Sequence, residues 1–456
     1  MTGWTPADAL DGLPAPHELA DFVGRQRWFS AHGGSPRVTG VRALARVHDD
    51  PPVDVLLLDV DDQGTQARYQ LQVERVTDSV DRLEHVRIGE TATYDALHDR
   101  EVTTVWPRLL DEEAKVGELR CYAVRHRDGP QLALDRPSLV LTAEQSNTTL
   151  AYGDAMVIKF YRQVSAGVNP DVEVHVALDV VGCEHIARPL GWVESDDGVL
   201  AFAQEFLGGA TEGWESAQAS VRDLFVEADL HPSDVGSDFA GEAERLGRVT
   251  AELHGSLREA FPTAELSPEQ LAERARGMSA HLRASVAEVA ALAPYATGLD
   301  EAFAALERSA RAGATMPVQR IHGDFHLGQT LRTPAGWKVL DFEGEPARPA
   351  EHRRAPDTPL RDVAGMMRSL DYAARLVLLD HPGDAQRAYR AHEWVEHNVD
   401  AFCAGYASAA GHDPHDDDVL LRALVTEKAV YEVVYESRMR PSWVVLPLGA
   451  VERLVG

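Results

Sequence analysis

The chain has 456 residues, and 44 Lys and Arg against 73 Asp and Glu give it a formal net charge of −29. This negative charge argues against nucleic acid and against an anionic membrane surface as partners, because both require a basic field. It does not exclude a small anionic ligand, since a local basic cluster can reverse the field inside a cleft. Cys121, Cys183 and Cys403 form no Cys-x-x-Cys pair, so we expect neither a disulfide framework nor a cysteine zinc site.

The N-terminus lacks the basic and apolar segments of a signal peptide, and no stretch approaches the roughly 18 apolar residues of a membrane span. We therefore expect a cytoplasmic protein. The N-terminal part, up to about residue 135, has three segments rich in β-formers, at 53–58, 69–73 and 118–124. The sequence Asp-Asp-Gln-Gly at 61–64 predicts a turn between the first two strands.

The middle of the chain predicts further strands at 138–141, 150–152, 156–161 and 200–206, with a polar turn at 144–149. A helix is expected to open at Asn169-Pro170. From residue 207 onward, stretches rich in Ala, Leu, Arg and Glu predict a mostly helical region, with helices at 217–229, 239–261, 267–290, 298–312, 360–380, 384–411 and 417–440. A β-like island at 318–342 interrupts this region, and polar chemistry concentrates there.

The strongest chemical signal is His322-Gly323-Asp324, followed by a carboxamide at Gln329 and by an apolar strand that ends at Asp341. Asp324 can accept the proton of an attacking hydroxyl, and Gln329 and Asp341 can hold Mg²⁺ through hard oxygen atoms. Either aspartate alone would favour a polar loop with a helix cap. The two aspartates, spaced 17 residues apart in this frame, favour phosphoryl transfer instead.

A second constellation lies upstream, where Lys159 interrupts an apolar strand. A buried lysine is costly unless it is paired or contacts a phosphate, although an edge-strand lysine could simply point to water. Glu173 on the following helix is a candidate partner, and together they would position nucleotide phosphates. The turn at Ser146, Asn147 and Thr148 matches no P-loop, but its hydroxyls and backbone N–H groups could cover phosphates.

These residues resemble the protein-kinase-like sugar and aminoglycoside phosphotransferases, and specifically the actinobacterial maltokinases, along almost the whole chain. The central motifs are shared with many kinases of this fold, whereas the terminal ones are more particular to maltokinases. Two segments depart from the family pattern, at 30–34 and at 444–447. The segments that carry the resemblance are 25–29, 143–148, 214–225, 238–242, 322–329, 341–346, 359–366, 428–432, 435–436 and 440–443.

The resemblance implies an α+β, bilobal fold like that of the eukaryotic protein kinases. It implies an N-terminal cap subdomain at 1–90, an intermediate subdomain at 91–206 that completes the β-rich small lobe, and a helical C-lobe at 207–456. Gln204, Glu205 and Phe206 would form the hinge strand that presents backbone groups to adenine. ATP and Mg²⁺ are the implied cofactors, and a separate trehalose-processing enzyme is a potential partner.

The last long helix predicts where the acceptor binds. Glu432 and Glu436 are four residues apart and share one helix face, and Trp443 follows the proline that ends the helix. Carboxylates accept hydrogen bonds from sugar hydroxyls, and an aromatic face stacks on a pyranose, so these residues suit a neutral or cationic sugar. Solvated glutamates on an ordinary helix are the alternative. His326 could reach the acceptor from the catalytic loop, or it could be purely structural.

We therefore expect an ATP-dependent sugar kinase that phosphorylates maltose to maltose 1-phosphate, where the resemblance supplies the sugar and the position. A glucosamine or other hexosamine kinase is the main alternative, because two carboxylates would suit an ammonium group. An aminoglycoside phosphotransferase and a pseudokinase-like binding module are weaker alternatives. The pseudokinase hypothesis predicts that the lysine, the base or the metal-binding aspartate is lost, but the chain retains all three.

Overall fold

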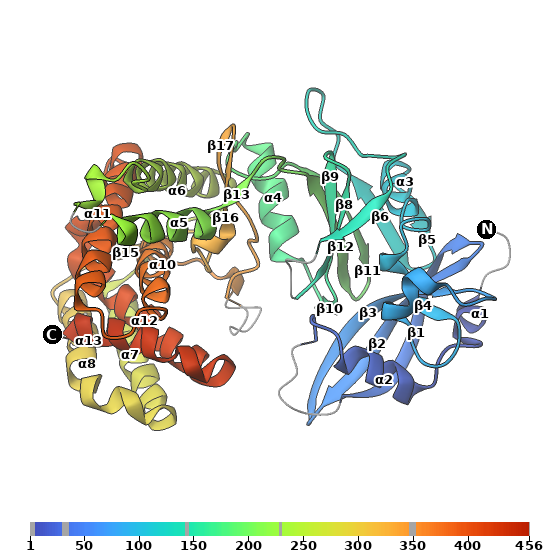
Figure 1. Ribbon diagram of the computed structural model, residues 1–456, viewed down its shortest axis with the longest axis horizontal. Helices are drawn as coiled ribbons and strands as arrows, with labels where there is room; N and C mark the ends of the chain where they lie inside the picture. The colour runs from blue at the N-terminus through green and yellow to red at the C-terminus, as the bar shows by residue number, and fades with distance from the viewer. Residues whose placement is uncertain (1–4, 30–35, 142–145, 228–229, 346–352, 456) are drawn as a thin grey trace. The chain divides into compact units, whose positions relative to one another are not determined.

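A computed structural model describes residues 5–29, 36–141, 146–227, 230–345 and 353–455. The segment 30–34 and the start of the expected turn, 144–145, lie outside these residues. The chain divides into two compact units, Met1–Val176 with Ala187–Gly208 and Ala177–Ile186 with Gly209–Gly456 (Figure 1). The β-rich first unit and the helical second unit confirm the α+β fold expected from the sequence. The cap boundary near residue 90 stays a prediction.

Two antiparallel sheets form the first unit. One has the order β1-β2-β3-β10, with β4 paired to β3, and the other has the order β5-β6-β11-β12-β9-β8-β7. The strands are β1 (Arg37–Asp49), β2 (Pro52–Asp62), β3 (Thr65–Arg75), β4 (Thr93–Asp95), β5 (Lys115–Val116), β6 (Leu119–Ala123), β7 (Ser138–Leu141), β8 (Thr148–Tyr152), β9 (Met156–Phe160), β10 (Gln163–Val164), β11 (Pro189–Ser195) and β12 (Gly198–Glu205).

Helices and 3-10 turns complete this unit and lead out of it. They are α1 (Pro6–Leu10), α2 (Pro16–Gly24), η1 (Asp81–Val86), η2 (Ala96–His98), α3 (Val105–Asp111) and α4 (Pro170–Val180). The strands expected near 53–58, 69–73, 118–124, 138–141, 150–152, 156–161 and 200–206 are all present. The expected turn joins β2 to β3 through Gln63 (φ 52°) and Gly64 (φ 91°), and two positive φ angles are typical of a tight hairpin.

Strand β2 explains how the two cores of the first unit form. Successive side chains of a strand point to opposite faces. Leu56 and Leu58 pack in one core with Phe22 of α2, and Val55 and Leu57 pack in the other core, which includes the seven-stranded sheet. Because both faces of β2 are buried, its sequence is a nearly continuous apolar run.

The second unit is helical apart from short strands. Its long helices are α5 (Gly213–Val226), α6 (Ala240–Ala260), α7 (Pro268–Glu288), α8 (Ala296–Arg311), α10 (Leu360–Leu378), α11 (Ala385–Ala410), α12 (Asp418–Met439) and α13 (Val445–Val455). All seven expected helices are present. Helix α11 lies along α6, α7 lies along α8, and α10 contacts both α11 and α12 (Figure 1).

Short strands and 3-10 turns carry the polar island of the second unit. Strand β14 (Ala264–Leu266) pairs with β15 (Met316–Val318), and β16 (Thr330–Thr333) lies between β13 (Thr211–Glu212) and β17 (Gly336–Val339). The 3-10 turns are η3 (Pro232–Asp234), η4 (Ala290–Tyr295), η5 (Leu327–Gln329), η6 (Pro414–Asp417) and η7 (Pro441–Trp443). Asp324 and Gln329 lie between β15 and β16, and Asp341 follows the end of β17.

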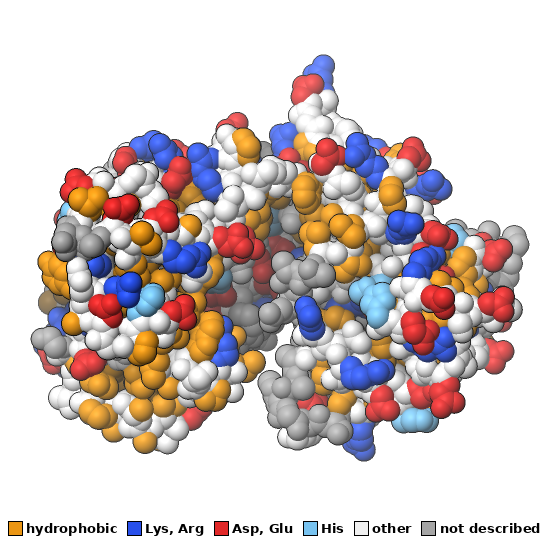
Figure 2. All heavy atoms as spheres, viewed as in Figure 1, with side chains coloured by type: hydrophobic (Ala, Val, Ile, Leu, Met, Phe, Trp, Pro, Cys, Tyr) orange, Lys and Arg blue, Asp and Glu red, His pale blue; other side chains and the backbone are white. Residues whose placement is uncertain are grey.

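On the face seen in Figure 2, carboxylates and cationic groups are interspersed over each unit. Among the described residues, no helix is long and apolar enough to cross a membrane.

Candidate active site

The loop that carries Asp324 is anchored by a buried carboxylate from α10. Asp362 Oδ2 accepts a hydrogen bond from the His322 backbone N–H at 2.8 Å, and Oδ1 accepts one from Gly323 N–H at 2.9 Å. His254 Nε2 of α6 lies 3.0 Å from the same Oδ2. Asp362 is 1% exposed, so this anchor holds the loop backbone in a site from which water is excluded.

His322 joins the two aspartate segments that the sequence predicted to act together. Its Nδ1 accepts a hydrogen bond from the Asp324 backbone N–H at 3.3 Å, so the ring proton lies on Nε2 and is donated to the Leu340 carbonyl at 2.8 Å. Leu340 N–H in turn donates to the Gln329 carbonyl at 2.9 Å. The backbones of Asp324, Gln329 and Asp341 are therefore held in one hydrogen-bonded unit.

Asp341 has a φ of +62°, the left-handed region that a non-glycine residue rarely adopts. Strained backbone of this kind persists where the surrounding structure fixes it, and it is concentrated at functional sites. Oxygen atoms of Asp341 and Glu343 lie within 4.8 Å of each other. Two carboxylates at this distance are the hard donors that Mg²⁺ prefers, so this segment fits a metal. Metal binding by Gln329 and Asp341 stays a prediction.

Lys428 of α12 contacts the Asp324 side chain. Its Nζ donates to Asp324 Oδ1 at 3.2 Å and to Glu345 Oε1 at 2.5 Å. Burial would raise the pKa of Asp324, but the positive charge of Lys428 outweighs it and lowers the pKa below its usual value. Burial likewise opposes the charge on Lys428, but the two carboxylates outweigh it and raise the lysine pKa. Asp324 is therefore ionised at neutral pH and able to accept a proton.

His326 lies at the start of η5, where its Nδ1 accepts a hydrogen bond from Gly328 N–H at 3.1 Å. Burial lowers the pKa of His326 although the charge of Asp324 opposes the shift. The ring is therefore neutral at pH 7, and Nδ1 has a structural role. Because Nδ1 accepts a hydrogen bond, the ring proton lies on Nε2. Binding of the sugar by His326 stays a prediction.

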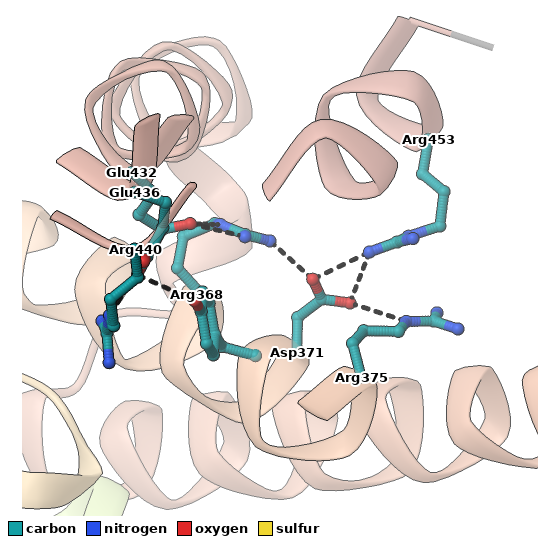
Figure 3. A network of polar contacts seen from close by, with 8 residues as sticks. Arg368, Asp371, Arg375, Glu432, Glu436, Arg440 and Arg453 are labelled. Carbon is teal, nitrogen blue, oxygen red and sulfur yellow. Dashed lines mark hydrogen bonds and ion pairs between the residues drawn. The ribbon is translucent and has the colours of Figure 1, made fainter. Parts of the chain in front are cut away.

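The two glutamates predicted to bind the acceptor are both paired with arginines (Figure 3). Arg368 of α10 donates to Glu432 Oε2 through Nη2 at 2.7 Å and through Nε at 3.2 Å. Arg440 binds Glu436 with two parallel bonds, from Nη2 at 2.6 Å and from Nε at 2.9 Å. Tyr372 O–H donates to Glu436 Oε1 at 2.8 Å. Both carboxylates are thus fixed in position and largely neutralised.

Asp371 is the centre of the neighbouring part of this network (Figure 3). Arg368 Nη1 donates to Asp371 Oδ2 at 2.8 Å, Arg453 Nη2 lies 2.8 Å from both oxygens, and Arg375 Nε lies 3.3 Å from Oδ1. Burial opposes ionisation of Asp371, but these three guanidinium groups outweigh it and lower its pKa. The network fixes Arg368, which in turn orients Glu432.

Trp443 lies in η7, beyond the end of α12. The Arg440 guanidinium carbon is 4.3 Å from the centroid of the Trp443 ring, so one face of the indole is covered by a cation. The indole is half-buried. Stacking on a sugar, as predicted for Trp443, would use the rest of its surface, and this role stays a prediction.

In the first unit, Lys159 is buried on β9 and forms an ion pair with Asp171 of α4, with Nζ 3.6 Å from Oδ2. Asp171 also accepts a hydrogen bond from Tyr161 O–H at 3.0 Å. Asn169 caps the helix by accepting from the Asp171 N–H at 2.9 Å. Asp171 precedes the predicted partner, Glu173, by two residues. The pairing of Lys159 with Glu173 stays a prediction.

The remaining expected nucleotide residues of this unit lie just before β8, at its start, and at the end of β12. Thr148 Oγ1 accepts from Arg162 Nε at 2.8 Å, and Asn147 Nδ2 donates to Ser146 Oγ at 3.1 Å. Their contact with phosphates stays a prediction.

The expected hinge at the end of β12 already uses some of its backbone donors. Glu205 N–H donates to the Arg188 carbonyl at 2.9 Å, and Phe206 N–H donates to the Ala155 carbonyl at 3.1 Å. The buried side-chain oxygen of Gln204 has no hydrogen-bond partner among the described residues. An unpaired buried acceptor is consistent with a ligand contact, and nucleotide binding by these residues stays a prediction.

The structure adds Lys428, Asp362 and Arg368 to the residues that the sequence predicted. Lys428 lies four residues before Glu432, so the helical period that paired the glutamates also puts the lysine on their face. No sequence pattern of this kind identifies Asp362 or Arg368. In a helical sequence, a charged residue that will be buried cannot be told from one that will be exposed.

Comparisons with known proteins agree with this geometry. Residues 22–99 match the maltokinase N-terminal cap domain, and residues 235–344 match the phosphotransferase enzyme family. A glucosamine kinase of Streptacidiphilus jiangxiensis is 30% identical over 327 residues, which cover 67% of this chain and 71% of that protein. A glucosamine kinase of Mycolicibacterium smegmatis (strain ATCC 700084 / mc(2)155) is 29% identical over 330 residues, covering 69% of this chain and 79% of that protein.

Solved structures give the same fold. A glucosamine kinase in complex with glucosamine, ADP and inorganic phosphate has a TM-score of 0.67 and 22% identity, and the match covers 100% of this chain and 98% of that chain. Crystal form A of a glucosamine kinase gives a TM-score of 0.69 at 21% identity over 96% of this chain and 97% of that chain. From the sequence relatives, the chain belongs to the sugar kinases of the phosphotransferase enzyme family that include these glucosamine kinases, and it is a phosphotransferase with a sugar hydroxyl as acceptor.

Proposed function

We propose that the chain is an ATP- and Mg²⁺-dependent kinase of a neutral sugar, with maltose as acceptor and maltose 1-phosphate as product. The observation that carries this proposal is the contact between Asp324 and Lys428. Lys428 Nζ lies 3.2 Å from Asp324 Oδ1 and keeps this carboxylate ionised. Lys428 is also the first of a row of polar groups along α12. The maltokinase-type cap at residues 22–99 adds support.

The proposed reaction uses Asp324 as the proton acceptor. A sugar hydroxyl loses its proton to Asp324, its oxygen bonds to the γ-phosphorus, and the bond from that phosphorus to the β–γ bridging oxygen breaks to release ADP. Lys428 keeps Asp324 ionised before the transfer. Asp341 and Gln329 would hold Mg²⁺, which neutralises charge on the phosphates when bound. Lys159 would orient the phosphates of ATP.

Helix geometry supports an acceptor with two rings. Glu432 lies about 6 Å along the helix axis from Lys428, and Glu436 about 12 Å, because the rise is about 1.5 Å per residue. A single pyranose whose reacting hydroxyl meets Asp324 would reach the turn of Glu432. The next turn, with Glu436 and then Trp443, is within reach of a second ring.

The charge of this region favours a neutral sugar over a cationic one. Arg368 already pairs with Glu432 and Arg440 with Glu436, at 2.7 Å and 2.6 Å. An ammonium group would have to compete with a guanidinium that donates two hydrogen bonds to each carboxylate. Glucosamine remains the second candidate because the curated relatives at 29–30% identity are glucosamine kinases.

ATP consumption measured with maltose, glucosamine, glucose and kanamycin as acceptors tests the proposal. We expect maltose to give the highest kcat/KM, and ³¹P NMR to show a phosphate on the anomeric oxygen. A higher kcat/KM for glucosamine than for maltose would overturn the neutral-sugar proposal in favour of a hexosamine kinase. Turnover of kanamycin alone would indicate an aminoglycoside phosphotransferase.

A further inference from the structure

A cavity of about 690 Å³ lies within the first unit, between the N-terminal segment and the β7–β8 hairpin. Its walls come from the end of α2 and the residues after it, from η1 and the chain that follows, and from the facing ends of β7 and β8. Among the described lining residues, none belongs to the strand of Lys159 or to the expected hinge. The cavity is therefore distinct from the groups expected to bind adenine, although Asn147 and Thr148 in its lining also belong to the turn expected to cover the ATP phosphates.

The lining is basic although the chain is strongly acidic. Among the described lining residues, Arg25, Arg27 and Arg87 face a single carboxylate, Glu84. The whole chain has 73 acidic residues and only 44 basic ones, so this excess of cations is opposite to the overall composition. A concave site with one sign of charge attracts ligands of the other sign even when the whole molecule repels them.

Two of the three arginines have guanidinium groups available to a ligand. Arg87 is engaged, because Nε donates to Glu84 Oε2 at 3.0 Å and Nη2 donates to Ser79 Oγ at 2.8 Å. Within the described residues, Arg25 uses only its Nε, which donates to the Asp21 carbonyl at 3.1 Å. Arg27 has no hydrogen-bond or ion-pair partner among residues 5–29, 36–141 and the other described segments. The forked donors of a guanidinium match the oxygens of a phosphate group.

The wall behind these arginines is rigid. Arg162 is fully buried, and its guanidinium pairs with Asp95 Oδ2 at 2.5 Å and donates to Thr148 Oγ1 at 2.8 Å. The same guanidinium carbon lies 5.1 Å from the ring centroid of Trp28. Trp28 and Thr148 both line the cavity, so the buried Arg162 guanidinium contacts two of its walls. A pre-organised wall lowers the entropy cost of binding a ligand.

We propose that this cavity binds the phosphate ester of a sugar, with Arg25 and Arg27 on the phosphate group. A volume of about 690 Å³ is far larger than a bare phosphate needs and is typical of small-molecule sites. The side chains of Gln26, Asn147 and His98 line the same space and supply hydrogen-bonding groups for hydroxyls. This proposal holds whichever sugar the enzyme phosphorylates.

Isothermal titration calorimetry of the full chain with glucose 6-phosphate, inorganic phosphate and AMP tests the proposal. We expect glucose 6-phosphate to bind, and its Kd to rise at least tenfold in Arg25→Met and in Arg27→Met. Arg37→Met is the matched control, because it removes the same charge from an exposed arginine on β1 outside the cavity. Lys159→Met tests for binding at the nucleotide site instead. Both controls should bind like the parent chain.

Four results would overturn the proposal. The first is that glucose 6-phosphate does not bind at millimolar concentration, and the second is that Arg37→Met loses as much affinity for it as the cavity variants do. The third is that Lys159→Met loses this affinity while the cavity variants keep it. The fourth is that inorganic phosphate or AMP binds more tightly than glucose 6-phosphate. Circular dichroism and thermal unfolding of each variant separate a lost site from a lost fold. Arg25 and Arg27 are exposed, so both variants should fold normally.

Discussion

The reactivity of Asp324 depends on one neighbouring cation. Burial alone would raise the pKa of this carboxyl, and Lys428 reverses the shift from a position 104 residues later in the chain. The pKa of Lys428 is raised in return, so the lysine keeps its charge throughout the physiological range. The pair therefore keeps the proton acceptor ionised at neutral pH.

Lys428→Met should move the acid limb of the kcat profile to higher pH. The pKa of Asp324 is depressed by Lys428, so activity that needs the carboxylate is present above that pKa and is lost as pH falls through it. Without the lysine, the effect of burial dominates, and protonation of Asp324 begins at higher pH. Measurement of kcat from pH 4 to pH 9 under saturating substrates checks this prediction.

Lys428→Arg is the matched control for this experiment, because it keeps the positive charge on the same helix turn. Its acid limb should stay near that of the parent enzyme, although kcat will fall if the longer group fits poorly. An unshifted acid limb in Lys428→Met would show that Lys428 does not set the ionisation of Asp324.

At the scale of elements, α10 holds the catalytic loop in position. Asp362 binds the backbone of the loop, and Gly365, one turn later, packs so closely that an added Cβ would lie 2.6 Å from the Phe325 carbonyl oxygen. Real Cβ contacts do not reach this distance, so any larger residue at position 365 must displace the loop. The separation of α10 from Phe325 thereby fixes the position of Asp324.

Gly365→Ala should therefore lower kcat and destabilise the fold by about 1–3 kcal/mol through overpacking. The control is Gly277→Ala in α7, where nothing lies within 4 Å of the added Cβ. That change should leave kcat unaltered and stabilise the helix by about 0.5–1 kcal/mol. Urea unfolding and steady-state kinetics measure both effects. Equal stability and equal kcat in the two variants would refute the close-packing argument.

Helix α12 should determine acceptor specificity. Trp443→Ala should raise the KM for maltose far more than the KM for ATP, because the proposed second ring would lose its contact surface. Glu432→Gln keeps the size of the side chain and removes one charge that Arg368 already balances. We expect a modest loss with maltose, about 1 kcal/mol in kcat/KM, and a larger loss with glucosamine if that sugar is bound through its ammonium group.

Glu288→Gln is the matched control for Glu432→Gln. Glu288 also pairs with an arginine, Arg438, at 2.6 Å, but it lies on the exposed part of α7. This substitution should change neither the KM for the sugar nor the KM for ATP. If both Trp443→Ala and Glu432→Gln leave every KM unchanged, the acceptor binds elsewhere.

At the scale of the whole molecule, local patterns predicted most of the fold. The long amphipathic helices and the apolar strands appear near their expected positions because each pattern depends on neighbouring residues. Strand β1 was missed, since its pairing with β2 contains three register shifts that break the alternation of side chains. Helix α13 was missed because Pro447 falls in its first turn, where proline is tolerated but suggests a loop.

The candidate site was only partly predictable for a related reason. Asp324, Gln329 and Asp341 are close in sequence, so their spacing indicated a shared function. The contact of Lys428 with Asp324 and the pairing of Arg368 with Glu432 span 104 and 64 residues. Such pairs arise from the packing of α10 and α12, and no local pattern in a single sequence encodes that packing. Asp171, which pairs with Lys159, was not named beside Glu173, because both lie in the first turn of α4 and the sequence does not distinguish them.

The central claim is that phosphoryl transfer to the sugar proceeds through the carboxylate of Asp324. Its most direct test is kcat of Asp324→Asn with the best acceptor, measured beside the Kd for ATP and beside the exposed control Asp416→Asn. The change is isosteric and removes the proton acceptor and its charge. We predict a loss of kcat of about 10²-fold or more with nearly unchanged ATP affinity and folding, and no effect in the control. Retention of most of the activity in Asp324→Asn would contradict the account.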